Sequence, residues 1–166
     1  SKKITVIYNG VLIKNENKKI KKIFKNNNDT IKIGMLSRIE KYKGQEDLLK
    51  SLLFLDTKYK NKLKIYIIGN GEKNYVSRIK TFLHHKKLSK FVVFKKYLNE
   101  DSKTIIKNLD ILVSLTRDFE GFGYSLAEAM AYSVPVISTN VGGSKEFLNK
   151  KNANIVKPYD PRGISL

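Results

Sequence analysis

Short apolar runs recur along the chain and alternate with longer stretches that mix polar and apolar residues. Most of the runs are four to seven residues long, rich in Ile and Val, and nearly continuous in their apolar character. That pattern is typical of strands buried on both faces of a parallel sheet. It predicts seven strands, at residues 4–8, 31–36, 63–69, 91–94, 111–115, 135–139 and 154–156.

The stretches between these runs have the periodicity of amphipathic helices. Residues 75–88 space Val76, Ile79, Phe82 and Leu83 at helical intervals. Shorter helices are predicted for residues 102–109 and 123–132, the second of which is rich in good helix formers. Residues 45–59 predict a longer helix with five leucines on one side: Leu48, Leu49, Leu52, Leu53 and Leu55.

Strands that alternate with helices predict βαβ units, a parallel sheet and right-handed crossovers. We therefore expect an α/β fold, with a Rossmann-like, doubly wound and mostly parallel sheet. A length of 166 residues fits a single domain. Its core is expected over residues 31–160, preceded by a segment at 1–30 that includes a polar, Lys- and Asn-rich linker at 14–29.

Composition excludes some classes of site and leaves the role of the charge open. The sequence has no cysteine, so it forms neither a disulfide nor a thiolate metal site. A formal net charge of +18 has several interpretations: an anionic small substrate, an anionic membrane surface, nucleic acid, or a compositional drift that spreads Lys over every solvated face. Lysines occur in short clusters at 18–25, 58–64, 86–96 and 145–151, which favours drift.

The residues that directly follow four of the predicted strands are the candidates for a site. Ligands of open α/β sheets bind beyond the carboxyl ends of the strands. At these positions the sequence has glycines and a few charged side chains: Arg38 and Lys43; Gly69 and Gly71; Glu120, Gly121 and Gly123; and Gly142, Gly143 and Glu146.

Taken singly, each candidate has a simpler explanation. Glycines after strands usually form turns, and Arg38 and Lys43 are two of 33 basic residues. The Gly-Asn-Gly turn at 69–71 lacks the further glycine of a dinucleotide-binding loop, which argues against NAD. No Asp-x-Asp triplet is present to hold a divalent cation. The adjacent His84 and His85 are expected to face solvent.

Taken together and in this order, the segments resemble the carboxyl-terminal domain of the retaining, group-1 (family-4) glycosyltransferases of the GT-B fold. VIYNGV at 6–11 is similar to the Asn-Gly segment that leads into that domain. GMLSRIEKYKG at 34–44 is similar to the family's G-R-(x)4-K-G stretch. The family's most specific feature, two glutamates separated by seven residues and followed by E-A-M-A and P-V, resembles EGFGYSLAEAMAYSVPVIST at 120–139. Further similar segments are IIGNGE at 67–72, NVGGSKEF at 140–147 and VKPYD at 156–160.

The sequence departs from the family's pattern at a few positions. Ser37 replaces the glycine that precedes the arginine, and Ser133 replaces the glycine usually found before V-P-V. Lys96 stands where a glycine is common. Asp118 and Phe119 lengthen the loop before the first glutamate.

The resemblance implies that the two glutamates bind opposite ends of a nucleotide-sugar donor. Glu120, the catalytic residue, would lie beside the donor sugar together with Gly121 and Phe122. Glu128, about a turn and a half into the helix that follows the Glu120 loop, would bind the ribose hydroxyls. Gly121 and Gly123 would let the backbone approach oxygen atoms that a Cβ would exclude.

The resemblance also implies a diphosphate site between these two carboxylates. Arg38 and Lys43 would supply fixed cations for the leaving diphosphate, on which negative charge develops. The helix that begins near Gly123 and Tyr124 would add backbone N–H groups and the positive end of its dipole. The other loops of the pocket would be formed by Gly69, Gly71, Gly142 and Gly143.

The implied enzyme transfers a hexosyl group from UDP- or GDP-sugar to an acceptor with retention of configuration, with no metal or other cofactor. We expect this chain to be its donor-binding domain, with residues 1–30 as the inter-domain segment and the acceptor-binding amino-terminal domain absent. Alone, it would bind nucleotide and do little chemistry. The acceptor would be a glycan or lipid-linked glycan of bacterial surface polysaccharide or lipopolysaccharide.

Location and two alternative functions follow from the same considerations. A cytoplasmic protein is expected, with the anionic inner face of the cytoplasmic membrane as a possible docking surface, because no apolar run of about 18 residues could span a bilayer. One alternative is a nucleotide-binding module without transfer activity. The other is a basic nucleic-acid-binding domain, but regularly spaced aromatic platforms and a reading helix are missing from the sequence, so no nucleic-acid partner is expected.

Overall fold

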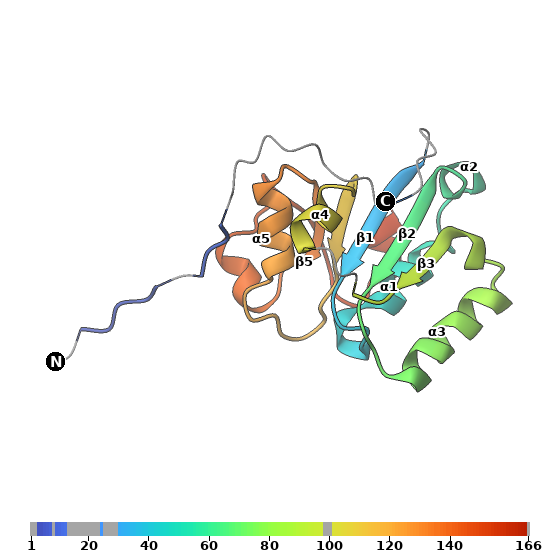
Figure 1. Cartoon of the computed structure of the whole chain (residues 1–166), viewed down its shortest axis with the longest axis horizontal. Helices are drawn as coiled ribbons and strands as arrows, with labels where there is room; N and C mark the ends of the chain where they lie inside the picture. The colour runs from blue at the N-terminus through green and yellow to red at the C-terminus, as the bar shows by residue number, and fades with distance from the viewer. Residues whose placement is uncertain (1–2, 8, 13–23, 25–29, 98–100, 166) are drawn as a thin grey trace.

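A computed structural model describes residues 3–7, 9–12, 24, 30–97 and 101–165 of the chain (Figure 1). Neighbouring strands of its sheet all pair in parallel, in the order β3-β2-β1-β4-β5-β6. The predicted Rossmann-like, doubly wound sheet is therefore confirmed. Its strands are β1 (Ile31–Leu36), β2 (Leu63–Ile68), β3 (Val92–Lys95), β4 (Ile111–Ser114), β5 (Val136–Thr139) and β6 (Asn154–Val156).

Helices cover both faces of the sheet, so that the strands are buried on two sides (Figure 1). One face packs against α1 (Gln45–Ser51) and α3 (Lys73–His85), and α6 (Pro161–Ser165) lies against α1. The other face packs against α4 (Ser102–Ile106) and α5 (Tyr124–Ala131).

Two separate cores result from this layering. Successive side chains of a strand point to opposite faces of a sheet, and β2 shows the consequence clearly. Ile65 and Ile67 belong to the core under α1 and α3, whereas Tyr66 and Ile68 belong to the core under α4 and α5. The nearly continuous apolar runs of the sequence are explained by this double burial. Short helical turns complete the elements: α2 (Thr57–Lys60), η1 (Lys41–Lys43), η2 (Ser89–Phe91) and η3 (Gly142–Glu146).

The long helix predicted for residues 45–59 is wrong. Helix α1 ends at Ser51, whose hydroxyl donates to the carbonyl oxygen of Leu48 at 2.7 Å. The next N–H groups bond to carbonyls three residues back, which tightens the chain into a turn. As a result Leu53, predicted on the buried side, is 43% exposed, whereas Leu48, Leu49 and Leu52 are buried as expected.

The strand predicted at residues 4–8 is also wrong over the part that the structure describes. Residues 3–7 form no strand pairing, and Ile4 and Ile7 are about nine-tenths exposed, at 91% and 89%. Apolar alternation alone does not make a strand, because its backbone groups need a partner strand. Tyr8 lies outside the described residues.

The predicted linker at 14–29 lies outside the described residues except for Phe24. That side chain is only 5% exposed, and its ring stacks on Tyr66 with 4.1 Å between the ring centroids. Phe24 is therefore part of the core under α4 and α5.

Candidate functional site

Two loops meet where the strand order of the sheet changes direction. β1 and β4 are neighbours in the middle of the sheet, and the later strands on each side extend outward from them. In open α/β sheets, ligands bind in the crevice at this switch point. β1 leads into residues 37–44 and β4 leads into residues 115–123, so the two loops selected from the sequence lie at the switch point.

Lys43 and Glu120 form an ion pair between these two loops. The Lys43 ammonium lies 2.9 Å from Glu120 Oε2, and the two side chains are only 14% and 18% exposed. Thr116 Oγ1 donates to the same oxygen at 2.7 Å. No hydrogen bond from the described residues reaches Glu120 Oε1. One carboxylate oxygen is thus held in place by two donors, while the other can accept a hydroxyl.

The loop after β5 approaches the Glu120 loop through two glycines. A Cβ at Gly142 would lie 2.1 Å from the carbonyl oxygen of Glu120, and one at Gly143 would lie 1.9 Å from that of Gly121. The N–H of Gly143 donates to the Glu120 carbonyl at 2.8 Å. These two glycines therefore have a packing role. Gly121 differs, since a Cβ there would meet no protein atom within 4 Å.

The loop after β2 joins the loop after β1 in a similar way. A Cβ at Gly69 would lie 1.9 Å from the carbonyl oxygen of Ser37, and one at Gly71 would lie 2.5 Å from that of Ile39. The N–H of Ile39 also donates to the carbonyl of Asn70 at 2.8 Å. The four loops that the sequence analysis selected are therefore joined in series along the carboxyl edge of the sheet.

Arg38 and Lys43, the predicted diphosphate cations, both contact Tyr42. The ring centroid of Tyr42 lies 5.9 Å from the Arg38 guanidinium carbon and 5.1 Å from the Lys43 ammonium. Arg38 also donates to the Tyr42 hydroxyl and lies 3.0 Å from Glu40 Oε1. The sequence analysis missed Tyr42, although an aromatic residue between two candidate cations is a usable signal.

Helix α5 begins at Tyr124 with Gly123 in the left-handed region, at φ 84°, and has no side-chain cap. Helix α4 beside it is capped, because Asp101 accepts from the Thr104 N–H at 2.7 Å. Hydrogen bonds from Thr104 lower the pKa of Asp101. The first turn of α5 lacks such a carboxylate. The Leu126 N–H donates to the Gly123 carbonyl at 2.9 Å, so the N–H groups of Tyr124 and Ser125 are the ones available to an anion.

Phe122 points its ring toward other aromatic side chains. Its ring centroid lies 5.0 Å from that of Tyr124 and 5.2 Å from that of Phe147. It also lines a mostly apolar pocket of about 300 Å³, together with Met130 of α5 and Val11. The Phe122 ring is therefore part of an aromatic and apolar cluster.

Glu128 lies apart from the Lys43–Glu120 pair. Its Oε1 accepts a hydrogen bond from Ser102 Oγ, at the start of α4, at 3.0 Å. The predicted pair of glutamates therefore occupies two places: one in the loop before α5 and one on the side of α5 that faces α4. Ser102 was not predicted, and the sequence separation of 26 residues gives no local signal for it.

A buried ion pair between Asp47 and Arg117 also lies beside these loops and was missed by the sequence analysis. Arg117 Nε and one terminal nitrogen donate to the two carboxylate oxygens at 2.9 and 2.8 Å. The hydrogen bonds to Asp47 raise the pKa of Arg117. Asp47 lies four residues after Lys43, and Arg117 lies three residues before Glu120. Nothing in the sequence, however, indicates that Asp47 and Arg117 form a pair.

The described residues contain no group of three or more His, Cys, Asp or Glu side chains placed to hold a metal ion. They also contain no helix that is both long and apolar enough to cross a membrane. His84 and His85 are exposed at the end of α3, as expected.

A family model described as "Glycosyl transferases group 1" matches residues 16–165. The chain is 32% identical over 150 residues to the capsular polysaccharide biosynthesis glycosyltransferase CapM of Staphylococcus aureus, covering 90% of this chain and 38% of that protein. It is 29% identical over 170 residues to the uncharacterized glycosyltransferase MJ1069 of Methanocaldococcus jannaschii, covering 98% and 42%. The chain thus spans well under half the length of these relatives.

Solved structures share the fold at lower sequence identity. HepE of Anabaena, in complex with UDP and glucose, gives a TM-score of 0.75 at 20% identity, covering 82% of this chain and 37% of that one. The lipopolysaccharide outer core galactosyltransferase WaaB gives 0.74 at 21%, covering 97% and 44%. The carboxyl-terminal domain of LpcC, a group 1 protein of Francisella tularensis, gives 0.71 at 24%, covering 81% and 71%.

Proposed function

Because this chain belongs to the group 1 glycosyl transferases, as its sequence resemblance predicted, we propose that it is the donor-binding domain of a sugar-transferring enzyme. The complete enzyme would move a hexosyl group from a nucleoside diphosphate sugar to an acceptor, with retention of configuration. The observation that carries the proposal is the Lys43–Glu120 pair at the switch point of the sheet.

The donor class is supported by the fold and by the charges at the site. HepE, which shares the fold, has been solved with UDP and with UDP-glucose. In this chain Arg38 and Lys43 would bind the diphosphate, and the uncapped first turn of α5 at Gly123 and Tyr124 would add N–H groups. These donors would stabilise the negative charge that develops as the diphosphate leaves.

Glu120 is proposed to be the carboxylate beside the reacting sugar. Lys43 and Thr116 hold one of its oxygens, which fixes the orientation of the other toward a sugar hydroxyl or the positive charge that develops on the ring. Gly121 and the Phe122 backbone would lie along the sugar. Glu128, oriented by Ser102, would accept hydrogen bonds from the ribose.

The proposal assigns different roles to the glycines of the neighbouring loops. Gly69, Gly71, Gly142 and Gly143 would shape the pocket by letting four loops pack closely, as their contacts indicate. The transfer would proceed without a metal, because the cations and helix N–H groups would supply the charge that a metal otherwise supplies.

The acceptor is proposed to be a glycan or lipid-linked glycan in the synthesis of a bacterial surface polysaccharide. CapM is named for capsular polysaccharide biosynthesis, and a 29% identical Escherichia coli relative, WclY, for O-antigen biosynthesis. The acceptor would be bound by an amino-terminal domain outside this chain, and the enzyme would work in the cytoplasm.

A panel of nucleotide sugars screened by thermal unfolding tests the donor class. A ligand at about 100 times its Kd adds about 2.7 kcal/mol to the free energy of unfolding. We expect UDP- or GDP-sugars to raise the Tm in the presence of a chelator, and an oligonucleotide to have no effect at physiological salt. Donor binding without sugar transfer by the full-length enzyme would instead support a nucleotide-binding module. A Tm raised by the oligonucleotide alone would contradict the donor site.

A further inference from the structure

Asp47 and Arg117 form the most buried ion pair among the described residues, with each side chain only 6% exposed. Asp47 lies in the first turn of α1, and Arg117 lies in the loop that follows β4. The guanidinium meets both carboxylate oxygens with separate N–H groups, at 2.9 and 2.8 Å. A two-point contact of this kind fixes both the distance and the angle between the elements that carry it.

The pair connects the two loops that carry Lys43 and Glu120. Along the same stretch, the backbone N–H of Arg117 donates to the carbonyl of Tyr42 at 2.8 Å. A Cβ at Gly44 would lie 2.1 Å from the carbonyl oxygen of Leu115, so the backbones are in direct contact. A shift of Arg117 would therefore move Thr116 and Glu120 relative to Lys43.

A third loop covers the same guanidinium. The Tyr159 ring, from the loop after β6, has its centroid 4.6 Å from the Arg117 guanidinium carbon. The Tyr159 hydroxyl donates to Asp118 Oδ1 at 3.3 Å. Arg117 thus contacts elements that follow β1 and β6, while its own loop follows β4.

A buried ion pair is a costly way to hold loops together. Removing two charges from water is expensive, and apolar residues of similar volume are often as stabilising or more so. An apolar pair, however, would not fix an angle between the loops. The geometry of this pair is therefore better explained by a need to fix the relative position of the two loops than by a need to stabilise the fold.

We propose that Arg117, held by Asp47, is a positioning residue that sets the distance between Lys43 and Glu120 and so governs the chemical step. This inference rests on the proposed role of Glu120 in sugar transfer. Arg117 would touch neither donor nor acceptor, and would act only through the loop that it orients.

The test replaces the pair in the full-length enzyme by residues that preserve folding. Asp47→Leu with Arg117→Met removes both charges together, which avoids an unpaired buried charge. Arg117→Lys keeps the charge but loses the two-point contact. The matched control is Glu46→Leu with Arg78→Met, which removes a neighbouring, more exposed ion pair between α1 and α3, whose side-chain hydrogen bonds join only these two helices. The readouts are Tm, kcat, the donor KM and the crystal structure.

For Asp47→Leu with Arg117→Met we expect a Tm near or above that of the wild type. For both Arg117 variants we expect a kcat lowered about ten- to a hundredfold, because small displacements of reacting groups have effects of that size. The donor KM should change less than threefold, and the Glu46/Arg78 control should keep its kcat within twofold. A merely structural pair would lower Tm and leave kcat per folded molecule unchanged. Wild-type kcat in well-folded Arg117 variants would overturn the proposal.

The crystal structures separate this inference from the proposed function. In both Arg117 variants the distance from Lys43 Nζ to Glu120 Oε2 should lengthen beyond the hydrogen-bond range, and in the control it should not. An unchanged distance would overturn the positioning role even if the enzyme transfers sugar as proposed. A wild type that neither binds nor uses any nucleotide sugar would instead contradict the proposed function, and the distances would still report whether Arg117 positions the loop.

Discussion

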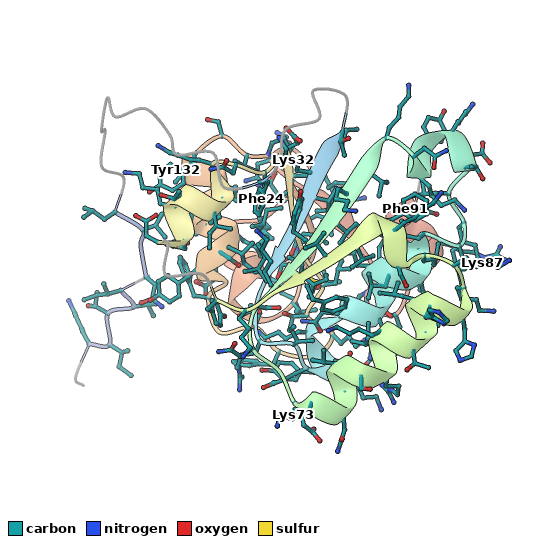
Figure 2. The ribbon with its side chains drawn as sticks, turned by 45° about the vertical axis from the view of Figure 1, so that its right-hand side comes forward. Phe24, Lys32, Lys73, Lys87, Phe91 and Tyr132 are labelled. Atoms are coloured by element: carbon teal, nitrogen blue, oxygen red, sulfur yellow. The ribbon has the colours of Figure 1, made fainter. Side chains whose placement is uncertain are left out.

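The two halves of the sheet, divided between β1 and β4, differ sharply in charge. The β1 half, residues 31–97, contains 17 Lys or Arg and five acidic residues, and only one of the acidic residues, Glu72, lies within 57–97, where twelve of the basic ones are. The β4 half, residues 101–165, contains eight basic and seven acidic residues. Figure 2 shows Lys73 at the start of α3 and Lys87 just beyond its end, on the outer side of the basic half.

The candidate site lies at the border and takes one kind of charge from each half. Arg38 and Lys43 follow β1, on the side of the basic half, whereas Glu120 and Glu128 belong to the loop and helix after β4. An even compositional drift would not produce this division. The difference indicates that the candidate site depends on the junction of the halves, while residues 57–97 have a single carboxylate, Glu72, for twelve basic side chains.

The largest expected effect comes from removing the carboxylate that the β4 half contributes. Glu120→Gln in the full-length enzyme should lower kcat about a hundredfold, equivalent to about 2.7 kcal/mol, because an amide cannot stabilise the positive charge that develops on the sugar. The affinity for free nucleoside diphosphate should change less than threefold. Steady-state kinetics and calorimetry measure the two quantities.

Asp118→Asn is the matched control for this substitution. Asp118 lies in the same loop but is exposed and contacts Tyr159 instead of Lys43. The Asp118→Asn enzyme should retain the wild-type kcat within a few fold. A Glu120→Gln enzyme with wild-type turnover would remove Glu120 from the chemistry.

This site shows where sequence analysis succeeds and where it stops. The strand positions along the chain were predictable, and so was the placement of Lys43, Glu120 and Gly123 in the loops that follow strands. Both depend on strand periodicity and on the family's spacing, which are local properties of the chain. The contacts of Glu120 with Thr116, and of Asp47 with Arg117, were not predictable. Thr116 and Glu120 lie four residues apart in one loop, so their contact depends on the local conformation of that loop. Asp47 and Arg117 are 70 residues apart, so their pairing depends on which loops the sheet order brings together.

The same limit explains the errors in the fold. The leucine periodicity over residues 45–59 is helical throughout, but a hydroxyl bond from Ser51 and a tight turn end α1 before Leu53. The apolar segment at 4–7 has the composition of a strand but no strand beside it among the described residues. Periodicity reports which side chains prefer burial, not which backbone groups find partners.

The next largest effect is expected on the cations of the β1 side. Lys43→Ala and Arg38→Ala should each weaken binding of UDP or GDP by about 1–3 kcal/mol, the range for hydrogen bonds to charged groups, and leave nucleoside binding unchanged. Lys43 should have the larger effect because it is 14% exposed and Arg38 is 63% exposed. Lys41→Ala, an exposed neighbour, is the control for charge alone. Equal affinity for nucleoside and diphosphate in calorimetry would reject the diphosphate assignment.

A smaller effect is expected at Glu128. Glu128→Gln should weaken binding of the free nucleotide by about 1 kcal/mol, because a charged acceptor for ribose hydroxyls is lost. Ser102→Ala should have a similar sign and a smaller size, since Ser102 only orients the carboxylate. Titration with UDP and GDP measures both. An unchanged affinity in Glu128→Gln would show that the ribose is bound elsewhere.

A substitution at Ser133, in the β4 half, is expected to change the free energy of unfolding without changing the affinity for nucleotide. The φ of Ser133, 58°, lies in the left-handed region, which costs a non-glycine residue about 1–2 kcal/mol and explains why relatives are expected to have glycine there. Ser133→Gly should raise the free energy of unfolding by about 0.5–1 kcal/mol, after the entropy of the added glycine is subtracted. Ala131→Gly, inside α5, should lower it instead. Urea unfolding measures both, and a changed nucleotide affinity in Ser133→Gly would mean that its effect reaches the donor site.

The smallest effect per residue is expected for the exposed lysines of the basic half. Phe91 and Val92 are buried, so only the flanks of the stretch 84–96 face solvent. The exposed residues at the end of α3 and just after it are His84, His85, Lys86, Lys87 and Lys90. Each Lys near an anionic leaflet contributes about 1 kcal/mol at most, and only within a Debye length of about 8 Å at physiological salt. We propose that this face gives weak, salt-sensitive docking on an anionic membrane.

Co-sedimentation with anionic and neutral vesicles at low and high salt measures that docking. Lys86→Gln with Lys87→Gln should reduce binding to anionic vesicles, because it removes two cations from the stretch 84–96, which contains no Asp or Glu. Lys150→Gln with Lys151→Gln removes the same charge from exposed positions in the mixed half and should have a smaller effect. If the two double variants bind equally well to anionic vesicles, only the net charge of the protein matters for membrane binding, and a specific docking face is ruled out. Equal binding to both lipid types would assign the lysines to compositional drift, and tighter binding to an oligonucleotide than to anionic vesicles would assign them to nucleic acid.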